Sequence, residues 1–80
     1  MPHVQVRLFA AARAAANTEE LQVPPGSIAE ILALCATDNS ELLRILPQCT
    51  ILIDGIARHD HQMMIAAGSQ LDVLPKFAGG

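Results

Sequence analysis

The sequence is poor in aromatic residues and in positive charge, and both shortages limit what it can bind. Only 2% of the residues are aromatic, and five lysines and arginines stand against eight acidic residues, for a net charge of -3. The five cations are scattered along the chain rather than clustered. Nucleic-acid binding needs a basic surface and often aromatic side chains on which bases stack. We therefore expect no nucleic-acid partner.

Cysteine and long apolar runs are also scarce. Cys35 and Cys49 form no metal-binding spacing, and a small disulfide scaffold usually carries about four to eight cysteines. No apolar run approaches the roughly 20 residues that cross a bilayer, and residues 1–5 do not resemble a signal peptide. We expect reduced structural thiols, no membrane association and a cytoplasmic protein.

Conventional catalytic groupings are missing as well. The sequence has no phosphate-binding glycine loop and no recognisable set of nucleophile, base and acid. His59-Asp60-His61 lacks the further ligands of a metal site, and we interpret it as a solvated turn. Eighty residues allow one domain, which buries only about 60% of its unfolded surface and has no room for a deep active site. We expect neither a bound cofactor nor an enzyme that acts alone.

The patterns that are present predict a mixed fold. Alternating apolar residues predict strands, and an alanine-rich run and two helical periodicities predict helices. Their order is strand 4–8, helix 10–16 closed by Asn17, strand 20–23 and helix 27–35. A shorter helix follows, capped by Ser40 and ended by Pro47, and then strands 50–53 and 56–58, joined by a turn at Asp54-Gly55, and a last strand over 71–74.

The helix that follows Pro24-Pro25-Gly26 is predicted most strongly. Ser27 and Glu30 have the spacing of a capping box, in which each side chain bonds the backbone N–H of the other residue. One apolar stripe follows, made of Ile28, Ile31, Leu32 and Cys35. We predict an α+β fold in which one mixed sheet packs on this main helix.

The C-terminus carries the strongest functional signal. Gly79-Gly80 follows a strand that ends at Pro75, so we expect a domain over residues 1–75 and an extended flexible tail over 76–80. Five extended residues span about 17 Å. Two residues without a Cβ fit a narrow channel, and the exposed α-carboxylate is suited to activation as a mixed anhydride with a nucleotide.

Several segments together resemble a known family. Residues 6–10 lead into a helix that contains Arg13, residues 21–27 lead into the long helix, and a strand over 71–75 precedes the tail. In this order and at this length, the whole sequence resembles the ubiquitin-like β-grasp sulfur carriers, and most closely the small subunits of molybdopterin synthase. It departs from them at Lys76, where a second proline is common, and at 67–69, where the turn is usually acidic.

The resemblance implies a carrier cycle. An adenylyltransferase similar to ubiquitin-activating enzymes would use ATP to adenylate the Gly80 carboxylate, and a persulfide from a sulfurtransferase would displace AMP and leave a thiocarboxylate. The tail residues Lys76, Phe77, Ala78 and Gly79 would then enter the catalytic large subunit of a heterotetramer, which builds the dithiolene of molybdopterin. This chain would be the non-catalytic sulfur donor.

A carrier also needs a docking surface. If Val6 and Leu8 face the helix, alternation directs Phe9 to the other face of the sheet, and Leu74 likewise points away from the core. An apolar pair beside the tail on a polar face is typical of a docking patch. The resemblance adds Arg13 and Ile56 as partner contacts, although Arg13 could equally be a solubilising charge.

Three other functions stay open. The same terminal chemistry serves sulfur delivery to thiazole synthesis, cysteine synthesis or transfer RNA thiolation, although residues 8–10 and Arg13 favour molybdopterin. A ubiquitin-like modifier would instead join Gly80 to lysines of target proteins. A plain interaction module would make Gly79-Gly80 incidental.

Overall fold

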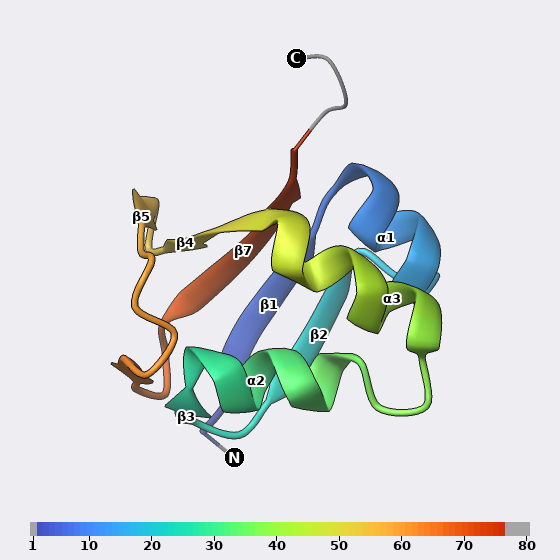
Figure 1. Cartoon of the computed structure of the whole chain (residues 1–80). Helices are drawn as coiled ribbons and strands as arrows, with labels where there is room; N and C mark the ends of the chain where they lie inside the picture. Colours follow the sequence, from blue (N-terminus) through green and yellow to red (C-terminus); the bar gives the residue numbers. More distant parts are fainter. Residues whose placement is uncertain (1, 77–80) are drawn as a thin grey trace.

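The computed structural model describes residues 2–76 and confirms the predicted α+β fold (Figure 1). Residue 1 and residues 77–80 lie outside the described part. The elements in chain order are β1 (Val4–Leu8), α1 (Ala10–Ala16), β2 (Glu20–Val23), β3 (Gly26–Ser27), α2 (Ile28–Cys35), α3 (Ser40–Ile45), the 3-10 helix η1 (Leu46–Gln48), β4 (Cys49–Ile53), β5 (Ile56–Ala57), β6 (Met64–Ile65) and β7 (Gln70–Pro75).

The main sheet places β7 at its centre. Its strand order is β2-β1-β7-β4-β5, and a second sheet pairs β3 with β6. Strand β7 runs parallel to β1 and antiparallel to β4. Because β1 and β7 run in the same direction, β7 ends at the opposite end of the sheet from the N-terminus of β1 (Figure 1).

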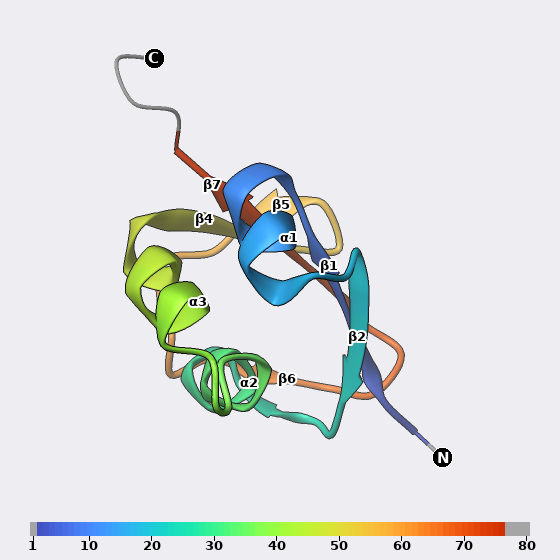
Figure 2. The same ribbon diagram turned by 90° about the vertical axis from the view of Figure 1, so that its right-hand side faces the viewer.

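The core lies between the sheet and the helices (Figure 2). Alternate residues of β1 are buried there, as the period-two pattern predicts, together with Ile51 and Ile53 of β4 and Leu71 and Val73 of β7. They pack against the apolar faces of α2 and α3 and against Ala12 of α1. The full set is Val4, Val6, Leu8, Ala12, Val23, Ile28, Ile31, Leu32, Cys35, Ala36, Leu42, Leu46, Ile51, Ile53, Ile65, Leu71 and Val73.

The predicted capping box at α2 is confirmed. Ser27 Oγ accepts from the Glu30 amide at 3.1 Å, and Glu30 Oε1 accepts from the Ser27 amide at 2.9 Å. These hydrogen bonds hold the pKa of the Glu30 carboxyl below its ordinary value. The carbonyls of His61 and Met63 accept from the next free amides of the helix, so the loop that carries His59-Asp60-His61 closes the N-terminus of α2.

The predicted cap of the helix in the middle of the chain was wrong, whereas its predicted end was confirmed. The cap of α3 is Asn39 rather than Ser40: its Oδ1 accepts from the Leu42 amide at 3.0 Å, while its Nδ2 donates to the Ala15 carbonyl at 2.9 Å. The side chain of Asn39 thereby ties α3 to α1, a long-range contact that local spacing cannot reveal. Helix α3 ends at Ile45, with Leu46 as its C-cap directly before Pro47, as predicted, and the proline lies in the short 3-10 helix η1 that follows.

Among residues 2–76, the positions with a left-handed φ are occupied by Asn, Asp or Gly, which tolerate it, except at Ala10. Asn17 ends α1 in the left-handed region at φ 58°, and the Asp54-Gly55 turn has φ values of 49° and 85°. Ala10, the first residue of α1, also lies in this region at φ 51°. A residue with a Cβ is disfavoured there, so the junction between β1 and α1 is strained.

None of the helices within residues 2–76 is long and apolar enough to cross a bilayer.

Substituting Ala10→Gly should raise the free energy of unfolding by about 0.5–1 kcal/mol, because glycine has no steric cost at a left-handed φ. Ala14→Gly, in the exposed middle of the same helix, should lower it by about 1 kcal/mol. Urea denaturation measures both changes. A loss of stability in both variants would contradict the strain at Ala10.

Candidate functional site

The face of the main sheet that points away from the helices carries the candidate site. We call it the open face and define it by the residues that alternate with the buried ones on β2, β1, β7, β4 and β5. The register places them in rows across the strands. They are Gln5, Arg7, Phe9, Glu20, Gln22, Thr50, Leu52, Ala57, Gln70, Asp72 and Leu74.

The open face changes from polar to apolar toward the end of β7. Gln22, Gln5 and Gln70 form a row at the far end. Arg7 and Asp72 are paired in the middle row. The row at the end of β7 contains Phe9 and Leu74, both half-buried. The apolar end of the open face therefore lies beside the segment that leads to Gly79-Gly80.

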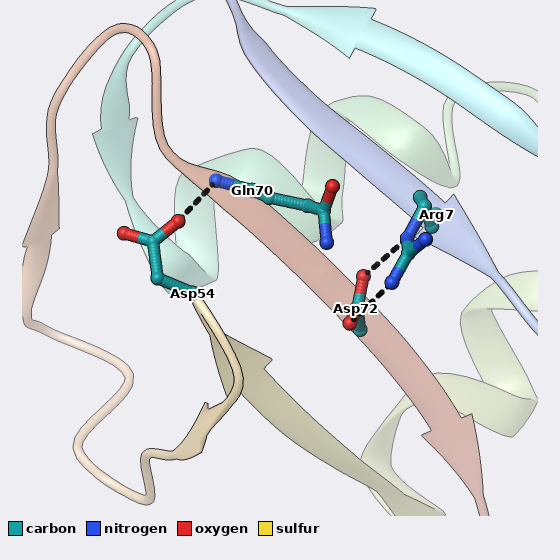
Figure 3. Close-up of polar contacts among 4 residues, drawn as sticks. All are labelled: Arg7, Asp54, Gln70 and Asp72. Carbon is teal, nitrogen blue, oxygen red and sulfur yellow. Dashed lines mark hydrogen bonds and ion pairs between the residues drawn. The ribbon is translucent and has the colours of Figure 1, made fainter.

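The middle row contains an ion pair (Figure 3). Arg7 Nε and Nη2 donate to the two oxygens of Asp72 at 3.0 and 3.2 Å. The Gln70 side chain extends toward the same guanidinium (Figure 3). Because hydrogen bonds decide how an amide is oriented, we assign its oxygen to the Arg7 side, where it accepts from Nη2 at 3.0 Å and Nε at 3.3 Å.

Burial within this pair is uneven. The side chain of Asp72 is 8% exposed, whereas that of Arg7 is 42% exposed. The hydrogen bond with Asp72 raises the pKa of the already basic guanidinium further. Sequence reasoning missed this pair. Strand alternation places Arg7 and Asp72 on the same face of the sheet, but only the register between β1 and β7, which are far apart in the chain, brings the two side chains together.

Phe9 is fixed at the junction of β1, β7 and α1. Its amide donates to the Val73 carbonyl at 3.2 Å, and its carbonyl accepts from the Ala12 and Arg13 amides at 3.1 and 3.3 Å. The Arg7 guanidinium carbon lies 5.5 Å from the centre of the Phe9 ring, within range of a cation–π interaction. The backbone and side chain of Phe9 are thus both held in place.

A hollow of about 180 Å³ opens beside Phe9, and both Phe9 and Arg13 line it. Arg13 Nη1 also contacts Glu19 Oε1 at 3.4 Å, with both side chains largely exposed. Such an exposed pair contributes little to stability and opens easily. The structure therefore brings two of the predicted contact residues to one edge of the open face and leaves Arg13 accessible.

Of the other predicted site residues, Leu74 lies near Phe9 and the rest are more widely spread. Leu74 is on β7, in the same row as Phe9. Ile56 lies on the edge strand β5, where it pairs with the buried Ile53 and is 56% exposed, so the register does not place it among the open-face residues. Lys76 is exposed, and its amide donates to the Gln48 carbonyl at 3.4 Å. The predicted roles of Phe77, Ala78, Gly79 and Gly80 lie outside the described residues.

Both cysteines are suited to packing rather than to nucleophilic chemistry. Burial raises the pKa of the Cys35 thiol to about 11. Partial burial also raises the pKa of Cys49, whose Sγ donates to the Ile45 carbonyl. Within residues 2–76, no three histidine, cysteine, aspartate or glutamate residues gather closely enough to hold a metal ion.

Breaking the ion pair from one side should destabilise the fold. Arg7→Met leaves the buried Asp72 carboxylate unpaired and should lower Tm by about 10 °C. The double variant Arg7→Met/Asp72→Leu should recover most of that loss, because removing both charges leaves neither one buried alone. Thermal unfolding followed by circular dichroism measures both. A double variant less stable than Arg7→Met would contradict this account of the pair.

Comparison of the sequence with protein-family models and with characterised proteins gives no match. Solved structures do match the fold. The small archaeal modifier protein 1 from Methanosarcina acetivorans superposes with a TM-score of 0.85 at 25% identity, covering 100% of this chain and 98% of that one. Its counterpart from Haloferax volcanii gives a TM-score of 0.81 at 19% identity, covering 96% and 100%.

A third similar structure was solved with a partner. It is a complex of subunits 1 and 2 of the molybdopterin-converting factor from Helicobacter pylori, and it matches with a TM-score of 0.73 at 20% identity over 98% of this chain and 99% of that one. The structural neighbours of this chain thus include small archaeal modifier proteins and subunit 1 of molybdopterin-converting factors. The chain has the ubiquitin-like β-grasp fold, as the resemblance in its sequence implied.

Proposed function

We propose that this chain is a cytoplasmic sulfur carrier that donates sulfur to the large subunit of molybdopterin synthase. One observation carries the proposal: Gly79-Gly80 follows, within five residues, a strand held on both sides at the centre of the sheet. A rigid support so close to the tip suits a chain end that partner enzymes must modify and then draw into a channel. The fold shared with molybdopterin-converting factor subunits supports this function.

The chemistry takes place at the Gly80 carboxylate. A partner adenylyltransferase joins the carboxylate to the AMP portion of ATP and releases pyrophosphate. The terminal sulfur of a persulfide on a sulfurtransferase then attacks the carbonyl carbon, AMP leaves, and an acyl disulfide forms. A second thiol cleaves the sulfur–sulfur bond, which leaves a thiocarboxylate on Gly80 and a disulfide on the partner. In this proposed cycle the partners supply the acid, the base and the nucleotide site, and this chain supplies the Gly80 carboxylate.

The open face supplies the contact with the large subunit. The docking patch that we propose consists of Phe9, Arg13 and Leu74, at the apolar end of the open face. Ile56 is a more distant contact on β5. Phe9 and Leu74 are only half-buried in the free chain, so a partner that covers them removes apolar area from water. The tail residues Lys76, Phe77, Ala78 and Gly79 would extend from this patch toward the partner's active site.

A ubiquitin-like protein modifier is the second candidate. Two of the similar structures are described as small archaeal modifier proteins. The same activated Gly80 would then react with lysine amines of target proteins rather than with a persulfide. Target proteins that carry this chain's tail on a lysine would favour the modifier, and a thiocarboxylate would favour the carrier.

The carrier function predicts a sulfur-for-oxygen exchange at the C-terminus. Intact mass spectrometry of the chain isolated from sulfur-replete source cells should show a species heavier by the difference between these two atoms. A variant without Gly80 should lack this species and should keep the same Tm, because the core described above is formed by residues between Val4 and Val73. If the unmodified chain shows no such species, the carrier function is wrong.

The docking patch is testable by charge substitution. Leu74→Asp and Arg13→Glu should each weaken binding to the large subunit by about tenfold or more, because they place a new carboxylate where the partner is packed. The matched control is Leu34→Asp, which adds the same charge to an exposed leucine on α2. Calorimetry should find the affinity of that control unchanged. Equal affinities for all three variants and the unmodified chain would contradict the patch.

A further inference from the structure

The ion pair between Arg7 and Asp72 lies next to the docking patch and belongs to no step of the carrier chemistry. The Arg7 guanidinium carbon is 5.5 Å from the centre of the Phe9 ring. Specific interfaces cover about 800 Å² on each partner, and neighbouring strands are about 4.8 Å apart. A partner that covers Phe9 and Leu74 therefore also covers the exposed side of Arg7.

The hydrogen-bonding capacity of Arg7 is only partly used. Asp72 and Gln70 accept from Nε and Nη2. Nη1 has no acceptor among residues 2–76, so in the free chain its two N–H groups can bond to water. Covering these N–H groups without a new acceptor would leave a polar group desolvated and unpaired, which opposes binding. The partner must therefore place an acceptor opposite Nη1.

The charges around Arg7 decide which kind of acceptor fits. Asp72 already neutralises the guanidinium, and it is the buried member of the pair. Glu20 lies directly across on β2 and adds a second negative charge beside Arg7. A carboxylate brought to Nη1 would be repelled by both, whereas an uncharged carbonyl oxygen would not.

We propose that the large subunit presents an uncharged carbonyl oxygen, from its main chain or an amide side chain, to Arg7 Nη1 beside the Phe9 ring. Arg7 is then a specificity-determining residue of the docking surface. It rejects partners that are merely apolar, because an apolar group opposite Nη1 leaves the donor unpaired. The inference rests on the proposed function, which identifies the partner.

The test uses the purified large subunit of molybdopterin synthase from the source organism, titrated by calorimetry with the whole chain. The variant is Arg7→Met/Asp72→Leu, with its fold verified by thermal unfolding. It makes the open face more apolar, so simple hydrophobic docking predicts equal or tighter binding. We expect binding about tenfold weaker or more, because the partner's carbonyl loses its donor. Equal or tighter binding overturns the inference.

Glu20→Gln distinguishes the two kinds of acceptor. It removes the neighbouring negative charge with little change of shape, on an exposed residue of β2. With an uncharged acceptor on the partner, the affinity should stay within about twofold at low ionic strength. With a partner carboxylate, removal of the repulsion should tighten binding about fivefold or more. That tightening would overturn the uncharged acceptor.

The variants also separate failure of this inference from failure of the proposed function. If Leu74→Asp abolishes binding but Arg7→Met/Asp72→Leu does not weaken it, the docking function stands and the role of Arg7 is wrong. If the unmodified chain does not bind the large subunit, the proposed function fails, and the inference fails with it.

Discussion

The parallel pairing of β1 with β7 is the interaction on which the rest of the structure depends. It joins two segments from opposite ends of the described chain and makes β7 the central strand. The same register buries Leu71 and Val73 against the helices and directs Asp72 and Leu74 to the open face. Core, ion pair and apolar end of the open face all follow from this single alignment, since a shift by one residue would exchange the two faces of β7.

Local chemistry predicted most of the elements. Strand alternation in β1, the capping box of Ser27 and Glu30, and the Asp54-Gly55 turn depend on neighbours within about four residues, and all three were found as predicted. The same alternation predicted that Leu74 faces away from the core. Such features can be derived from a sequence because the atoms that interact are close along the chain.

The features that sequence reasoning missed depend on contacts between distant segments. Asn39 caps α3 and also bonds α1, 24 residues away, so its advantage over Ser40 arises only after the helices pack. Arg7 and Asp72 are 65 residues apart, and the burial of that carboxylate follows from the register of two strands. The left-handed φ of Ala10 has the same origin, because Phe9 is bound to β7 on one side and to α1 on the other.

The central position of β7 also determines when this chain can fold. Because β7 follows all the other described elements, β1 and β4 cannot join into one sheet until residues 70–75 have been synthesised. Contacts between such distant segments form slowly, and the unpaired edges of β1 and β4 stay exposed to other chains until β7 arrives. A chain cut short before β7 would lack the strand that joins β1 to β4, so premature termination would produce an aggregation-prone fragment rather than a folded domain without its tail.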